Sequence, residues 1–182
     1  AYLNPALTII YEDKRGPEVE HIVYHEEEGI IGFVKDLNKK NEVLHDVVYF
    51  KGEQDGITVE AAFQYTNEFH ENILGFCNNI FNAEGGTHIT GFKTVFTTVI
   101  NSYARELGIL KEKDSNFTGA DVRNGMTAIV SIKHPDPRFE GQTKTKLDNQ
   151  DAARVTAKVT GDEIQLYFDK NLEVLKLSLI HI

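Results

Sequence analysis

The hydrophobic pattern of this chain changes at Thr87. Before that residue, apolar and β-branched side chains come in short runs separated by turn-forming residues, and after it apolar residues recur every three or four positions as far as Leu107. Short runs bounded by turns are typical of β-strands, whereas the spacing of three and four is typical of an amphipathic helix. The sequence therefore predicts mostly sheet in the first eighty residues and a long helix over 87–107, with Thr87 as its N-cap and Gly108 as its C-cap.

Two pairs of β-rich runs flank turn sequences in the first part of the chain. The first pair is 7–11 and 19–24, the second is 47–50 and 57–65, and a further strand is expected at 72–77. Each pair predicts a hairpin because the Gly, Pro and Asp residues between the β-rich runs favour tight turns. A short helix over 30–37, with apolar residues at helical spacing, is expected to cover one face of the sheet.

The second part of the chain alternates helix and strand signals. Thr118 and Asp121 have the spacing of a capping box and predict a short helix through Arg123. Residues 126–132 are almost all apolar or β-branched, which indicates a central strand covered on both faces. A long C-terminal helix should follow from Asn149, bent or interrupted near Gly161.

Composition limits the classes of protein that this chain can belong to. The 182 residues suffice for one domain, or two small ones, and the formal net charge of −9 argues against a chain-wide basic surface for nucleic acid. A single cysteine, Cys77, excludes an internal disulfide, and we expect it in the core. With one cysteine and no signal-peptide pattern at the start, a reducing cytoplasm is the expected location. No apolar run has the length of a membrane span, so no membrane attachment is expected.

The loop over 139–147 carries the candidate functional residues. Gln142 and Lys144 lie two residues apart behind Gly141. If this stretch is extended, both side chains point the same way, and a phosphate could be held by an amide and an ammonium group together. Lysines in a polar loop are also common as solvated charges, so the spacing alone leaves both interpretations open.

Other candidate sites are weaker. His134 stands beside Pro135 without a nucleophile or an orienting acid nearby in the sequence, and so gives no triad. The acidic run over 26–28 indicates a solvated turn, and His21 and His25 are too far apart along a strand to share a metal ion. We expect no metal site in this chain.

Three groups of residues together resemble a known family. They are 76–92, with Glu84-Gly-Gly-Thr-His88; 121–128, with Asp121-Val-Arg-Asn-Gly125; and 134–147, with His134-Pro-Asp-Pro137 and Gln142-Thr-Lys144. In order and spacing they are similar to the transducer domain of the B subunits of DNA gyrase and topoisomerase IV. The similarity runs from residue 1 to about Lys176 and does not separate the two enzymes.

The resemblance implies an α+β fold: a mixed or antiparallel sheet with helices on one face, a left-handed βαβ crossover as in transducer domains of GHKL-type ATPases, and a long C-terminal helix. It implies a transducer core over 1–148, a helix over 149–176 leading to a TOPRIM domain, and a tail over 177–182 unlike the family. Such a domain lies between that TOPRIM domain and an N-terminal ATPase domain.

The resemblance also implies a function. Gln142 and Lys144 would contact the γ-phosphate of ATP in the neighbouring ATPase domain, Lys144 as a catalytic residue. They would couple ATP binding and hydrolysis to DNA strand passage and supercoiling. ATP, and Mg²⁺ in the intact enzyme but not on this fragment, would be the cofactors. A second B subunit, the A subunit and double-stranded DNA would be the partners.

Two alternatives to this function stay open, and one family feature is missing. Thr98 stands where many family members carry an arginine that faces the DNA cavity, which puts a DNA contact from this helix in doubt. A stand-alone module in which the Gln142 loop binds an anion or an RNA backbone without hydrolysis is the alternative of a different class. A purely structural domain that transmits no signal is the other.

Overall fold

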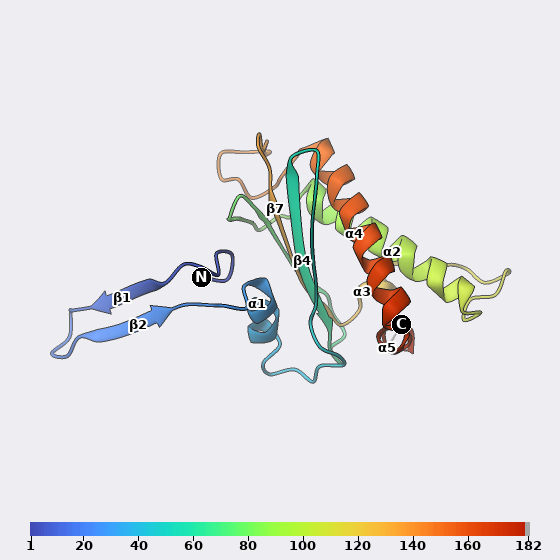
Figure 1. Ribbon diagram of the computed structural model, residues 1–182, viewed down its shortest axis with the longest axis horizontal. Helices are drawn as coiled ribbons and strands as arrows, with labels where there is room; N and C mark the ends of the chain where they lie inside the picture. The colour runs from blue at the N-terminus through green and yellow to red at the C-terminus, as the bar shows by residue number, and fades with distance from the viewer. Residues whose placement is uncertain (181–182) are drawn as a thin grey trace.

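The computed structural model describes residues 1–180, with side chains through Lys176. Its elements, in chain order, are β1 (Ile9–Asp13), β2 (Glu20–Tyr24), α1 (Ile30–Leu37), β3 (Val48–Gln54), β4 (Ile57–Tyr65), β5 (Asn72–Cys77), β6 (Ile80–Asn82), α2 (Thr87–Glu106), α3 (Gly119–Arg123), β7 (Met126–Lys133), α4 (Gln150–Lys170) and α5 (Leu172–Ile180). A five-stranded sheet in the order β3-β4-β7-β5-β6 forms the centre of the molecule (Figure 1).

Strand β7 lies in the middle of this sheet, as its apolar sequence predicts. It pairs antiparallel with β4 and parallel with β5, and residues 126–132 are all buried. The other pairs are antiparallel, so the prediction of a mixed sheet is confirmed. The chain returns from β5 to the parallel strand β7 through β6, α2 and α3. The handedness of this connection stays a prediction.

Helices cover both faces of the sheet, which differs from the expected one-sided arrangement. Phe63 and Val130 belong to the larger core under α2 and α4, whereas their neighbours Ala62 and Ile129 belong to a smaller core with Val34 of α1. Successive residues of a strand point to opposite faces, so α1 lies on the face away from α2 and α4 (Figure 1). The reason is that Ala62, Phe76 and Ile129 give this second face a smaller apolar patch, against which α1 packs.

The hairpin signals are confirmed. Between β3 and β4, Asp55 and Gly56 have φ values of 55° and 74°, the left-handed conformation that a two-residue hairpin turn needs. A second such turn, at Asn78 and Asn79, joins β5 to β6. Strand β6 was not predicted, because it has only three residues and so gives no clear sequence pattern.

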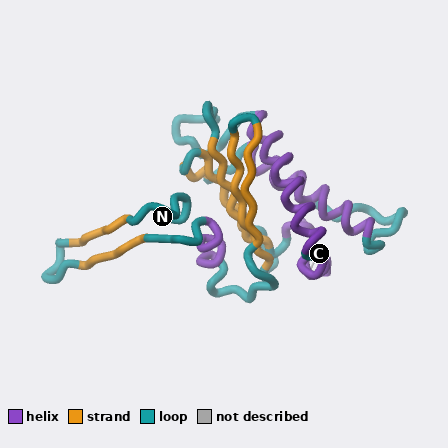
Figure 2. The backbone as a smooth tube through the Cα atoms, in the orientation of Figure 1, coloured by secondary structure: helices purple, strands orange, loops and turns teal. Residues whose placement is uncertain are grey.

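The first hairpin stands apart from the body of the molecule. Strands β1 and β2 form their own two-stranded sheet, which projects away from the five-stranded sheet (Figure 2). Ile10 and Val23 face each other in its register and are 65% and 61% exposed. This hairpin therefore contributes little to the core.

Helix α2 begins one residue earlier than a Thr87 cap would place it. Gly86 is the N-cap, with no side-chain cap, so the predicted N-cap is wrong. A Cβ at Gly86 would lie 2.5 Å from the backbone N and O of Leu147, and only glycine fits this contact. At the other end, Leu107 is the cap, and Gly108 follows it with φ 71°, as expected for a glycine that ends a helix.

Helix α4 runs without a break through Gly161, so the interruption expected there is wrong. A Cβ at Gly161 would lie 3.0 Å from Val95 of α2, which shows that this glycine serves close packing of the two helices. The break falls at Asn171, whose side chain donates to the carbonyl of Tyr167. Of the expected tail at 177–182, residues 181 and 182 lie outside the described part of the chain.

Candidate functional site

The loop between β7 and α4 carries Gln142 and Lys144, and backbone hydrogen bonds close its base. The amide of Asp148 donates to the carbonyl of Arg138 over 2.9 Å, and the amide of Glu140 donates to that of Lys146 over 3.0 Å. The ammonium group of Lys146 lies 2.8 Å from the carboxylate of Glu140. Because these contacts hold both arms together, the tip of the loop projects from a fixed stem.

The returning arm of the loop is also attached to the start of α2. Leu147 is buried, its amide donates to the carbonyl of Gly85, and its carbonyl accepts from the amide of Thr87. The loop is thus connected to α2 at Thr87, and α4 follows it directly at Gln150.

The tip is a turn, so the condition of an extended stretch is not met. The amide of Lys144 donates to the carbonyl of Gly141 over 3.0 Å, so Gln142 and Thr143 occupy the centre of a tight turn. Lys144 has a φ of 56°, which lies in the left-handed region that residues other than glycine seldom adopt. The alternation argument for where Gln142 and Lys144 point therefore does not apply.

Gln142 and Lys144 are both exposed. The Nζ atom of Lys144 lies 6.0 Å from the centroid of the Phe139 ring, and within the described residues it has no carboxylate partner. Lys146, two residues further, is by contrast paired with Glu140. Lys144 is therefore the cation of this loop that is free to bind an external anion.

The residues that hold the loop from outside were not predictable from the sequence. Asn82, at the end of β6, donates from Nδ2 to the carbonyl of Lys144 over 2.8 Å. The amide of Glu84 donates to the carbonyl of Thr145 over 2.9 Å, and the Thr145 hydroxyl donates to the Glu84 carboxylate. No spacing rule connects residues about sixty positions apart, so the sequence offered no signal for these contacts.

His134 has an acidic partner after all, and the expectation that it stands alone is wrong. Its side chain is 3% exposed, and its Nε2 lies 3.0 Å from Oδ1 of Asp151 in the first turn of α4. Its Nδ1 accepts from the amide of Asp136, so the ring proton lies on Nε2 and points to Asp151. This hydrogen bond from His134 is the main cause that lowers the pKa of Asp151.

Asn149 closes the same region. Its Oδ1 accepts from the amide of Arg138 over 2.6 Å, and its Nδ2 donates to the carbonyl of Asp136. It caps these backbone groups rather than the helix that it precedes. Together with His134 and Asp151, it fixes the start of α4 against the end of β7.

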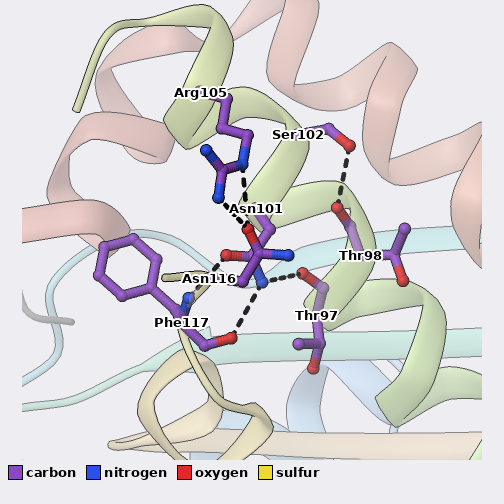
Figure 3. A pocket seen from close by; sticks show the side chains of 7 residues that line it. All are labelled: Thr97, Thr98, Asn101, Ser102, Arg105, Asn116 and Phe117. Atoms are coloured by element: carbon purple, nitrogen blue, oxygen red, sulfur yellow. Dashed lines mark hydrogen bonds between the residues drawn. The ribbon is translucent and has the colours of Figure 1, made fainter. Parts of the chain in front are cut away.

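The outer face of α2 carries a shallow polar hollow (Figure 3). Its lining residues are Thr97, Thr98, Asn101, Ser102, Arg105, Asn116 and Phe117. Thr98 donates to the carbonyl of Thr94 within its own helix, and the guanidinium of Arg105 is held by Asn116 and by the backbone of Lys111 and Asp114. At Thr98 this face presents a hydroxyl group and no charge.

Residues 1–180 contain neither a candidate metal-binding cluster nor a candidate membrane-spanning helix. This part of the chain contains no group of three or more His, Cys, Asp or Glu side chains that could hold a metal ion. It also contains no helix that is both long and apolar enough to span a membrane. Cys77 is buried, and burial raises its thiol pKa to about 11, so it behaves as a core residue.

Comparison with known proteins gives consistent results. The family model described as DNA gyrase B matches residues 29–179. The chain is 50% identical over 173 residues to the DNA gyrase B subunit of Enterococcus faecalis, covering 94% of this chain and 26% of that protein. It is 45% identical over 177 residues to that of Streptococcus pneumoniae, covering 97% of this chain and 27% of that protein. The chain thus spans about a quarter of these relatives.

Solved structures with the same fold include two bacterial ATPase regions. The 43K ATPase domain of Thermus thermophilus gyrase B, in complex with an aminocoumarin, superposes with a TM-score of 0.88 at 30% identity, covering all of this chain and 48% of the other. The topoisomerase IV ATP-binding domain of Francisella tularensis gives a TM-score of 0.80 at 23% identity, covering 99% and 48%, and shows a shared fold. Because the DNA gyrase B model matches residues 29–179, which make up most of this chain, the chain belongs to the DNA gyrase B family.

Proposed function

We propose that this chain is the energy-coupling segment of an ATP-dependent type II DNA topoisomerase of the gyrase type. In this proposal Gln142 and Lys144 contact the γ-phosphate of ATP held in a neighbouring ATPase domain, and Lys144 is the catalytic residue. The observation that carries the proposal is the state of Lys144: an exposed ammonium group without a carboxylate partner in the described residues, on a loop whose backbone is held at both ends.

The contact energies favour transfer of Lys144 from its present neighbour to a phosphate. An exposed lysine over an aromatic ring gains about 0.5–1 kcal/mol. A hydrogen bond to a charged group contributes about 1.5–3 kcal/mol. Lys144 would therefore leave the Phe139 ring for a phosphate oxygen, and the amide of Gln142 would add a neutral donor. The nucleotide, when bound, supplies the terminal phosphate, and the chain supplies these two contacts.

Loss of that phosphate would change how firmly the loop is held. Nearly complete switching between two arrangements needs about 5.5 kcal/mol of difference in binding. An arginine that reaches a transferring phosphoryl group from another domain contributes 10³–10⁵ in rate, roughly 4–7 kcal/mol, so one well-placed cation is of sufficient order. The loop would transmit this difference in binding free energy to α2 through Leu147 and to α4 through Asn149.

The wider setting follows from the family. ATP with Mg²⁺ would be bound mainly outside this chain, and the partners would be a second B subunit, the A subunit and double-stranded DNA in the cytoplasm. Residues 1–148 would contain the transducer core, with the β1–β2 hairpin as an appendage before the family match begins at residue 29. Residues 149–176 would connect to a TOPRIM domain, and 177–182 would lie beyond this segment.

The test is ATP turnover by a full-length gyrase B protein that carries this segment. Lys144→Ala should lower kcat by roughly 10²–10³, the usual loss when one transition-state donor is removed. Lys146→Ala, in the same loop but paired with Glu140, is the matched control and should change kcat less than about threefold. Wild-type turnover by the Lys144 variant would refute the proposed contact.

A further inference from the structure

We propose that Asn82 is a positioning residue that holds the backbone of Lys144 in the conformation required for phosphate contact. This inference rests on the proposed function of Lys144. Asn82 lies at the end of β6, 62 residues before Lys144, and is 2% exposed. Its Nδ2 donates to the carbonyl oxygen of Lys144 over 2.8 Å.

Lys144 needs such support because its backbone is strained. A φ of 56° is unfavourable for a lysine, and such residues persist only where the surroundings hold them. The amide of Lys144 is bonded to Gly141 within the turn, and the carbonyl is bonded to Asn82. The first contact moves with the loop, whereas the second ties the residue to the sheet.

Within the described residues, the side-chain amide of Asn82 makes a single hydrogen bond. The Oδ1 atom is buried and has no hydrogen-bond partner there, so Nδ2 makes the only directional contact of this side chain. A buried amide with one half unpaired is unfavourable for stability. Stability therefore does not explain why an asparagine is buried here, whereas a requirement for a hydrogen-bond donor at the Lys144 carbonyl does.

Loss of Asn82 should free Lys144 without releasing the whole loop. The amide of Glu84 still donates to the carbonyl of Thr145, and Leu147 still pairs with Gly85 and Thr87. The peptide after Lys144 could then rotate, and Lys144 could return to a negative φ that redirects its side chain. We therefore expect a defect in catalysis rather than in folding.

The experiment compares Asn82→Ala and the near-isosteric Asn82→Leu, neither of which can donate a hydrogen bond, in a full-length gyrase B protein that carries this segment. Both should lower kcat for ATP about tenfold, while KM for ATP stays within about twofold. Asn82→Gln, which keeps the donor, should recover part of the loss. Asn67→Ala, whose side chain bonds Glu42 far from the loop, is the control and should match wild type.

A double variant separates this inference from the proposed function. In Lys144→Ala, a further Asn82→Ala should lower kcat no more, because Asn82 acts through Lys144. If Lys144→Ala alone has wild-type turnover, the proposed function is wrong. If Lys144→Ala is impaired but Asn82→Ala and Asn82→Leu are normal, or if the two losses multiply, the positioning role is wrong and the function of Lys144 stands.

Discussion

His134 and Asp151 join the last strand of the sheet to the first turn of α4 through a hydrogen bond of 3.0 Å. In the sequence, His134 precedes the loop that carries Lys144 and Asp151 follows it. The histidine is buried and the carboxylate is about half exposed. The pair therefore fixes the start of α4 relative to the sheet.

This pair predicts a pH-dependent contribution to stability. The His134 hydrogen bond lowers the pKa of Asp151 in the folded state. A carboxyl group with a depressed folded pKa stabilises the fold above its unfolded pKa, about 3.9, and loses this effect as pH falls through the folded pKa. Asp151→Asn should thus destabilise the chain at pH 7 by about 1 kcal/mol or less, since Asp151 is half exposed.

Thermal unfolding at pH 7 and near pH 3 measures this effect. The difference between Asp151→Asn and wild type should shrink in acid. Asp148→Asn, an exposed carboxylate three residues earlier, serves as control and should show no such trend. A difference that is equal at both pH values would show that the charge of Asp151 does not stabilise this junction.

A second prediction concerns the contact between the loop and α2. Gly86→Ala should lower the free energy of unfolding by at least about 2 kcal/mol, because the added methyl group would lie 2.5 Å from the Leu147 backbone. Gly141→Ala is the matched control: its Cβ would meet nothing closer than 3.9 Å, and stability should change by less than about 0.5 kcal/mol. Urea unfolding of both variants measures the contrast, and equal stabilities would contradict the close contact at Gly86.

A third prediction separates an energy-coupling segment from a nucleic-acid-binding module. With a net charge of −9 and no cation at Thr98, the isolated chain should bind double-stranded DNA or RNA more weakly than about 10 μM at ~0.15 M salt. Fluorescence anisotropy with labelled duplexes measures this affinity. Tighter binding that weakens steeply with salt would instead favour the alternative in which the Gln142 loop holds a nucleic-acid backbone.

Local signals predicted most of the secondary structure. The apolar period of α2, the Asp55-Gly56 turn and the Thr118–Asp121 capping box depend on residues close together in the chain, and the structure contains all three. The order of the motifs over the whole chain predicted the mixed sheet and the DNA gyrase B family, and both predictions are confirmed.

The features that the sequence did not predict depend on distant contacts. Gly86 replaces Thr87 as N-cap because Leu147 packs against it, and Gly161 continues its helix because Val95 lies beside it. The left-handed conformation of Lys144 and the contact from Asn82 arise only when β6 and the loop meet. Each case is decided by a neighbour about sixty residues away, which no local pattern records.

The most direct measurement of the central claim is a crystal structure of a gyrase B protein that carries this segment together with its ATPase domain, bound to a non-hydrolysable ATP analogue. The proposed function predicts that Nζ of Lys144 leaves the Phe139 ring and lies about 3 Å from an oxygen of the terminal phosphate. If the nucleotide pocket is filled while Lys144 stays over Phe139, or turns to solvent, the proposed contact is wrong.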